Sequence, residues 1–196
     1  FGNTPGVLLN IETLKNTINY AKIESKNFNV KIVYLSPKGN IINQNLLVDF
    51  LSYSSIIFIS GRYEGIDERL FKFFVDYEIS IGDFVLSGGE FIIMFLIDSI
   101  IRLFPNVLNN IESILNDSFI EHILDSPHYS KPKLIYNVYV PKILFSGNHL
   151  FIKIWNNKHK LGCTFFKRRD LFNNFKMSKI QYMLLRSFIL ENREKI

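Results

Sequence analysis

Three short segments of this chain combine glycine with polar residues directly after apolar runs. They are Tyr34–Gly39 (YLSPKG), Gly61–Gly65 (GRYEG) and Ile81–Glu90 (IGDFVLSGGE). Glycine permits positive φ angles and close approach of the backbone to a ligand, so such loops can present N–H and C=O groups to the edge of a purine. Three of them in succession predict a small-molecule pocket that is built largely from backbone.

The segments around these loops alternate between strand-like and helix-like patterns. The predicted strands are Val30–Leu35, Ser55–Ser60 and Val75–Ser80, and the predicted helices are Ile11–Ile23, Asn43–Ser52, Asp67–Phe74 (capped by Asp67) and Glu90–Phe104. This alternation predicts an α/β fold with a mainly parallel sheet covered on both faces. Ligands of such sheets bind at the carboxyl ends of the strands, where all three loops lie.

The chain changes character after Pro105. Residues 109–116 are polar without a clear period and resemble a linker, and beyond them the pattern is helical rather than sheet-forming. A helix is predicted over His149–Lys160, with Gly162 as its stop. We therefore expect a cofactor domain over 1–108, a linker over 109–121 and a small, mainly helical domain over 122–196.

The last predicted helix opens with a capping box. Ser178 and Gln181 have the spacing at which each side chain bonds the other's backbone N–H. After this cap, Ile180, Leu184 and Phe188 recur at helical spacing. We expect these three side chains to share one face.

Charge divides the chain at the same place. Residues 1–108 hold 9 Lys and Arg against 11 Asp and Glu, a net charge of −2, whereas residues 109–196 hold 14 against 7, a net charge of +7. A near-neutral ligand domain followed by a basic, polyanion-binding domain is one interpretation. The other is a solvated basic surface that binds nothing.

Several common sites are excluded by their missing motifs. The chain has no G-x-x-x-x-G-K-[ST] loop, no complete G-x-G-x-x-G, no H-E-x-x-H and no G-x-S-x-G. Its four histidines lack metal spacing and only one cysteine is present, so no structural zinc site is expected. The single cysteine, Cys163, fits a reducing cytoplasm. A ligand with an adenine and a sulfonium, but no phosphate, suits loops that offer backbone contacts.

The most apolar segment, Phe91–Phe104, is interpreted as a buried helix. It contains Asp98 and Arg102, which argue against a membrane span, and four-residue spacing favours an ion pair between them. Asp117, further on, is locally most simply a helix cap. Spacing alone gives neither Arg102 nor Asp117 a catalytic role.

Five motifs in fixed order carry a specific family resemblance. GRYEGIDER (61–69), SIGDFVLSGGE (80–90), DSF (117–119), SPHYSKP (126–132) and LFSGNH (144–149) closely resemble those of bacterial tRNA (guanine-N1)-methyltransferases, the TrmD type of the SPOUT class. The similarity runs from about Phe1 to Leu190. The family's first strand and helix have no counterpart, so we expect the first domain to lack them.

The resemblance implies a SPOUT-type, mainly parallel sheet with a deep trefoil knot, a homodimer, and methyl transfer from S-adenosylmethionine to N1 of guanosine 37, just 3′ of the tRNA anticodon. It implies a cytoplasmic enzyme without membrane partners, and magnesium use with no ligands assigned. Carried onto matching positions, the cofactor contacts are Tyr34, Leu35, Ser36, Pro37, Gly61, Tyr63, Glu64, Ile81, Gly82, Leu86, Gly88 and Gly89.

The family's catalytic aspartate falls on Asp117 and its assisting arginine on Arg102. A carboxylate beside guanine N1 can remove its proton, and a guanidinium can stabilise the charge that develops toward O6. The basic half then supplies candidate phosphate contacts, which are Lys131, Lys133, Lys153, Lys158, Lys160, Lys167, Arg168 and Arg169.

Two other functions stay open at this point. One is a truncated or degenerate relative that binds tRNA through its basic half without catalysis. The other keeps methyl transfer but directs it to a ribose 2′-hydroxyl, as in other SPOUT enzymes. The DSF setting of Asp117 favours base methylation.

Overall fold

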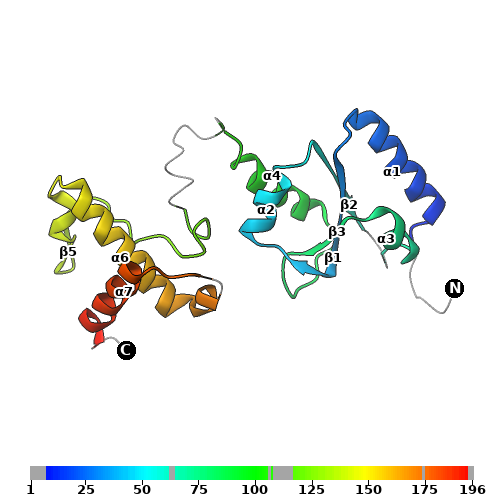
Figure 1. Ribbon diagram of the computed structural model, residues 1–196. Helices are drawn as coiled ribbons and strands as arrows, with labels where there is room; N and C mark the ends of the chain where they lie inside the picture. Colours follow the sequence, from blue (N-terminus) through cyan, green and yellow to red (C-terminus); the bar gives the residue numbers. More distant parts are fainter. Residues whose placement is uncertain (1–7, 62–64, 106, 108–116, 174, 194–196) are drawn as a thin grey trace. The chain divides into compact units, whose positions relative to one another are not determined.

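A computed structural model of the protein describes residues 8–61, 65–105, 107, 117–173 and 175–193. The chain divides into two compact units, Phe1–Asn109 and Asn110–Ile196 (Figure 1). The domain limits expected from the sequence, with a linker over 109–121, remain a prediction.

The first unit is a three-stranded parallel sheet with helices on both faces. Its elements are α1 (Ile11–Ser25), β1 (Val30–Ile41), α2 (Gln44–Phe50), β2 (Ser55–Ser60), α3 (Arg69–Phe74), β3 (Tyr77–Ser80) and α4 (Glu90–Ile101). The strand order is β2–β1–β3, and both pairings are parallel. The predicted parallel α/β architecture is confirmed for this sheet.

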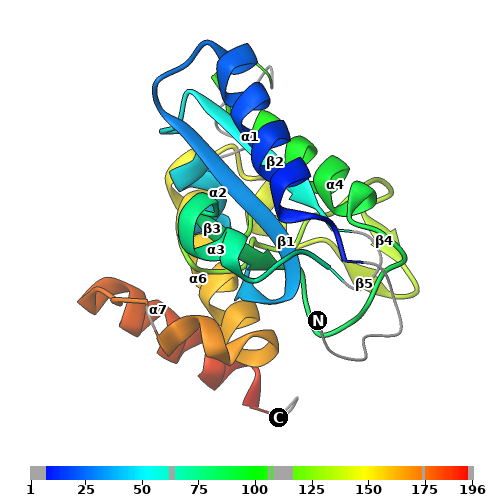
Figure 2. The same ribbon diagram turned by 90° about the vertical axis from the view of Figure 1, so that its right-hand side faces the viewer.

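The central strand β1 divides its side chains between two cores. Val33 and Leu35 pack with α2 and α4 in a cluster that includes Phe50 and Leu96. The alternate residues of β1 pack with α1 and α3 on the opposite face in the cluster Ile18, Ile32, Tyr34, Ile59, Ile66 and Leu70. Figure 1 shows these helix pairs on the two sides of the strands, and Figure 2 shows α1 lying across β1 and β2. Because successive side chains of a strand point to opposite faces, an apolar strand of this kind needs both layers.

The strand β1 is longer than predicted. It continues from Leu35 to Ile41, and its pairing with β3 shifts register between Leu35 and Asn40. The shift brings Gly39 against the backbone of Ile79, where a Cβ would lie 2.5 Å from the carbonyl carbon of Glu78. Glycine is therefore required by close backbone approach, and the segment predicted to be only a loop also extends the sheet.

The prediction that Asp67 caps α3 is wrong by one residue. The helix begins at Arg69 with Glu68 at the N-cap position and no side-chain cap. The Asp67 carboxylate instead accepts hydrogen bonds from the Arg69 backbone N–H and guanidinium, at 2.9 and 2.6 Å. These hydrogen bonds lower the pKa of Asp67 to about 2. Asp67 still steadies the first turn, but from one position further upstream.

The helix α4 is only half buried, which corrects the expectation of a buried helix. Leu96 and Ile100 face the sheet, whereas a second stripe of large apolar side chains is exposed, with Phe91 at 69%, Met94 at 56% and Phe95 at 53%. A helix that is apolar all round is normally covered all round. Within the described segments, no helix is long and apolar enough to traverse a lipid bilayer.

The second unit is mainly helical and contains one short hairpin. Its elements are β4 (Leu134–Ile135), β5 (Val138–Tyr139), η1 (Lys142–Phe145), α6 (His149–Lys167), η2 (Arg169–Asn173) and α7 (Lys179–Glu191). The hairpin was not predicted. Its turn residues Tyr136 and Asn137 have φ angles of 49° and 62°, the left-handed pair that a two-residue type I′ turn requires.

The prediction that Gly162 stops a helix is wrong. The helix α6 runs through Gly162 to Lys167, and Gly162 is buried inside it. A Cβ at Gly162 would overlap the ring of Phe188 from α7. The glycine thus serves close packing of α6 on α7 rather than helix termination.

The capping box that opens α7 is confirmed. Ser178 Oγ accepts from the Gln181 N–H at 3.2 Å, and Gln181 Oε1 accepts from the Ser178 N–H at 2.8 Å. Along the face that these residues share, Phe188 is buried and Leu184 packs on the core, whereas Ile180 is 71% exposed. Buried contacts of α7 begin after its first turn.

Candidate active site

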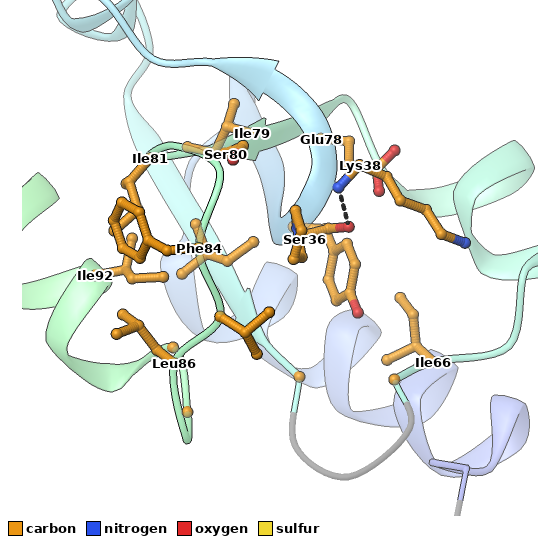
Figure 3. Close-up of a pocket in the computed structure, with 18 of the residues that line it drawn as sticks. Ser36, Lys38, Ile66, Glu78, Ile79, Ser80, Ile81, Phe84, Leu86 and Ile92 are labelled. Carbon is orange, nitrogen blue, oxygen red and sulfur yellow. Dashed lines mark hydrogen bonds between the residues drawn. The ribbon is translucent and has the colours of Figure 1, made fainter.

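A cavity of about 410 Å³ lies in the first unit at the carboxyl ends of its strands (Figure 3). All three glycine-bearing segments contribute to its wall. The predicted cofactor residues that line it are Tyr34, Leu35, Ser36, Pro37, Gly61, Ile81, Gly82, Leu86, Gly88 and Gly89. The other two, Tyr63 and Glu64, lie outside the described residues. Segments distant in the chain meet here because parallel strands end at the same edge.

Serines at the strand ends fix the glycine loops. Ser60, the last residue of β2, accepts a hydrogen bond through Oγ from the Gly89 N–H at 3.1 Å. Ser80, the last residue of β3, accepts from the Gly82 N–H at 3.2 Å and donates to the Gly82 carbonyl at 3.1 Å. The loop after β3 is therefore tied to the ends of both outer strands.

Local geometry explains why glycine stands at two positions of this wall. A Cβ at Gly89 would lie 2.6 Å from Ser60 Oγ and 3.3 Å from Leu35 Cδ1, so the tie to β2 leaves no room for a side chain. Gly82 has a φ of +145°, a conformation that L residues rarely adopt. Both glycines line the cavity, and the serine hydrogen bonds fix their backbone there.

Tyr34 forms the floor on the α3 side. Its ring meets Phe71 edge-to-face, with 5.0 Å between centroids, and its hydroxyl lies beside Gly61 and Gly65. Burial, then the negative charges of Glu78 and Glu68, raise the pKa of Tyr34. The phenol therefore stays protonated at neutral pH and can donate a hydrogen bond.

Apolar side chains and two carboxylates complete the cavity. Figure 3 shows Ile81, Phe84 and Leu86 on one side and Ile66 on the other, with Ser36 between them. Glu68 and Glu78 also line the wall, and Glu78 Oε1 is buried with no hydrogen-bond partner among the described residues.

The sequence analysis did not single out Glu78. A usable signal was present, since Glu78 is a carboxylate inside a short buried strand, between Tyr77 and Ile79. A charged side chain on a strand that faces a core requires a partner or a ligand. Its position two residues before Ser80 also predicts the same face of β3.

Comparison with known proteins assigns this chain to a family. The family model described as tRNA (Guanine-1)-methyltransferase TrmD matches residues 1–174. This chain belongs to that family.

Individual relatives agree with the assignment, and each is named tRNA (guanine-N(1)-)-methyltransferase. The relative from Baumannia cicadellinicola subsp. Homalodisca coagulata is 42% identical over 191 residues, covering 97% of this chain and 75% of the relative. The one from Legionella pneumophila (strain Lens) is 44% identical over 193 residues, covering 98% and 77%. The one from Francisella philomiragia subsp. philomiragia is 47% identical over 172 residues, covering 87% and 67%.

The two catalytic residues expected from the TrmD resemblance lie in different units. Arg102 follows α4 as its C-cap in the first unit, is exposed, and donates its backbone N–H to the carbonyls of Asp98 and Ile100. Asp117 belongs to the second unit, where it is half-buried at the start of a turn. Their roles remain predictions.

The candidate phosphate contacts of this TrmD-family chain need one correction. Lys160 is 5% exposed and lies 3.7 Å from Asp125 Oδ1, so it cannot reach a phosphate. Lys158 pairs with Glu191 at 2.7 Å, and Arg168 pairs with Asp170 at 2.7 Å. The remaining candidates are exposed and are Lys131, Lys133, Lys153, Lys167 and Arg169.

The part of the chain that the structure describes contains no recognisable set of magnesium ligands. No group of three or more His, Cys, Asp or Glu side chains there is arranged to hold a metal ion. Among the described residues we therefore assign no magnesium ligands.

Proposed function

We propose that this tRNA (guanine-N1)-methyltransferase binds S-adenosylmethionine in the cavity at the strand ends of its first unit. The activity follows from family membership, since relatives of that name align with 97–98% of this chain. The observation that carries the placement is that ten of the predicted cofactor residues line one cavity. When bound, the cofactor supplies an activated methyl group.

The cavity fits such a ligand in size and chemistry. Its volume of about 410 Å³ lies within the usual range for small-molecule pockets. Backbone at Gly88 can offer groups to the adenine edge, and the apolar wall covers the faces of the adenine. Glu68 and Glu78 outnumber Lys38 among the charged residues of the wall, which suits a ligand with sulfonium and ammonium charges. The unpaired Glu78 Oε1, among the described atoms, can accept a hydrogen bond from the ligand.

We infer that Asp117 is the general base and Arg102 the group that stabilises developing charge. Guanine N1 carries a proton at neutral pH and is a poor nucleophile until that proton is removed. A carboxylate accepts it, and a guanidinium offers two hydrogen bonds to O6, where negative charge develops.

The second unit is proposed to bind tRNA. Its surface carries the exposed side chains of Lys131, Lys133, Lys153, Lys167 and Arg169. Cations of this kind fix the position of a nucleic acid through phosphate contacts without reading its sequence. Because the substrate is tRNA, we place the reaction in the cytoplasm.

We also infer the knotted SPOUT topology for the first unit. The loop after β3 passes to the end of β2, where the Gly89 N–H donates to Ser60 Oγ. It therefore crosses the end of the central strand β1, as a chain that threads through the strand-end loops must do.

The proposed homodimer uses the exposed face of α4. Phe91, Met94 and Phe95 form a contiguous exposed apolar stripe, whereas apolar residues on the surface of a monomer are usually scattered singly. Two-fold pairing of this stripe would bury it in both copies. We expect the parent protein to sediment as a dimer and Phe95→Glu to sediment as a monomer. The matched control is Phe73→Glu on α3, which is 70% exposed and should stay dimeric. A monomeric parent, or a dimeric Phe95→Glu, would contradict the interface.

Transfer of a tritium-labelled methyl group to a tRNA transcript tests the function. We expect label at N1 of the guanosine just 3′ of the anticodon, located by digestion and chromatography. A transcript with inosine at that position, which lacks the exocyclic amine, shows whether that amine is recognised. Label on a ribose 2′-hydroxyl would favour a different SPOUT activity, and tRNA binding without label would favour a non-catalytic relative.

A further inference from the structure

The helix α6 buries two polar side chains in the second unit. Thr164 is 0% exposed and Lys160 is 5% exposed. Thr164 Oγ1 donates to the Lys160 carbonyl at 2.7 Å and accepts from the Leu124 N–H at 2.8 Å. Valine would fill the same space as threonine without a hydroxyl, so packing alone does not explain this residue.

Asp125 is the second anchor of the same segment. Its N–H donates to Ser118 Oγ at 2.9 Å, and its carboxylate accepts from the Ser126 N–H at 2.6 Å. The carboxylate also lies 2.8 Å from His128 Nε2 and 3.7 Å from Lys160 Nζ. Burial opposes ionisation of Asp125, but these hydrogen bonds and the Lys160 charge prevail, and the pKa of the carboxyl lies below its usual range.

The described part of the loop held by these anchors starts at Asp117. It reverses direction through Phe119 and His122, whose φ angles are 76° and 61°, and the Phe119 N–H donates to the Ile123 carbonyl at 2.8 Å. Left-handed conformations are unfavourable for such side chains and persist where the surroundings fix them. The contacts of Ser118, Leu124 and Asp125 provide that fixation.

We propose that Ser118, Asp125 and Thr164 are positioning residues that hold the loop of Asp117 on α6, so that its carboxylate can act on guanine N1. The proposal rests on the proposed role of Asp117 as general base. Asp117 directly precedes Ser118 and belongs to no helix or strand, and the hydrogen bond from the Asp125 N–H to Ser118 Oγ fixes the residue next to it. A displacement of about 1 Å in a catalytic group can cost on the order of 10²-fold in rate.

The test uses Thr164→Val in the full chain, with Thr164→Ser as the conservative variant. We expect Thr164→Val to lower kcat for methyl transfer by about 10- to 100-fold, with unchanged affinity for S-adenosylmethionine, and Thr164→Ser to restore most of the rate. The matched control is Thr17→Val, because Thr17 makes the same bond to the carbonyl four residues earlier but is exposed and holds no loop. It should keep the parental rate.

A double-variant cycle separates positioning from general destabilisation. If Thr164 acts through the Asp117 carboxylate, Thr164→Val has no further effect on the residual rate of Asp117→Asn. An equal loss in both backgrounds, or a parental kcat in Thr164→Val, would overturn the proposal. If Thr164→Val does not fold, Ser118→Ala takes its place in the same cycle. A parental rate in Asp117→Asn itself would instead remove the general base on which the proposal rests.

Discussion

Replacing Asp117 with asparagine lowers the rate of methyl transfer by about 10²- to 10⁴-fold, the usual contribution of a general base. Asparagine keeps the shape of the side chain but cannot accept the guanine N1 proton. The proposed cofactor residues all precede Asp117 in the chain and those described line a cavity of the first unit, so affinity for S-adenosylmethionine should not change.

Single-turnover kinetics with labelled cofactor and saturating tRNA measure this effect directly. The control is Glu121→Gln, which neutralises an exposed carboxylate in the same loop and should keep the parental rate. Asp117→Asn that methylates tRNA as fast as the parent, or that loses cofactor affinity in parallel with rate, would show that the carboxylate is not the base.

Gly39→Ala is expected to disrupt the sheet and the cavity together. The new Cβ would overlap the backbone nitrogen of Ile79 and lie 2.5 and 2.6 Å from the carbonyl carbons of Glu78 and Ile79. Backbone atoms cannot rotate away, so β1 and β3 must separate, at a cost of about 1–3 kcal/mol or more. Because Lys38, Glu78 and Ile79 line the cavity, cofactor affinity should fall by about 10-fold or more.

Thermal unfolding followed by circular dichroism, together with calorimetric titration of the cofactor, tests this prediction. The exposed neighbour Asn40→Ala removes a side chain without adding a Cβ and serves as the control. Parental stability and affinity in Gly39→Ala would mean that β1 and β3 are further apart here than the structure has them.

The parallel sheet was predictable because its signal is local. The strand Ser55–Ser60 was predicted with the bounds it has, since an apolar run between turn residues determines it. The helix predicted over Ile11–Ile23 has the predicted start and continues to Ser25. One mistake arose where a distant contact decides the outcome. Gly162 is a helix stop by local rules, but a ring from another helix packs against it.

Much of the candidate site was also predictable, because glycine loops after strands carry a local signature. The ten described cofactor candidates meet in one cavity, whereas Glu78 was missed because its signal is a lone carboxylate within a strand and not a loop motif. For Lys160, in contrast, the sequence suggested a function that the structure excludes. Counted as a surface cation from its sequence, it is buried beside Asp125, a pairing that depends on how the chain folds back on α6.

Isothermal titration of S-adenosylmethionine into the folded parent protein tests most directly whether the cavity at the strand ends holds the methyl donor. We expect saturable binding at one site per chain, with S-adenosylhomocysteine as a competitor. Absence of any binding in a sample whose unfolding transition is intact would contradict the placement of the cofactor.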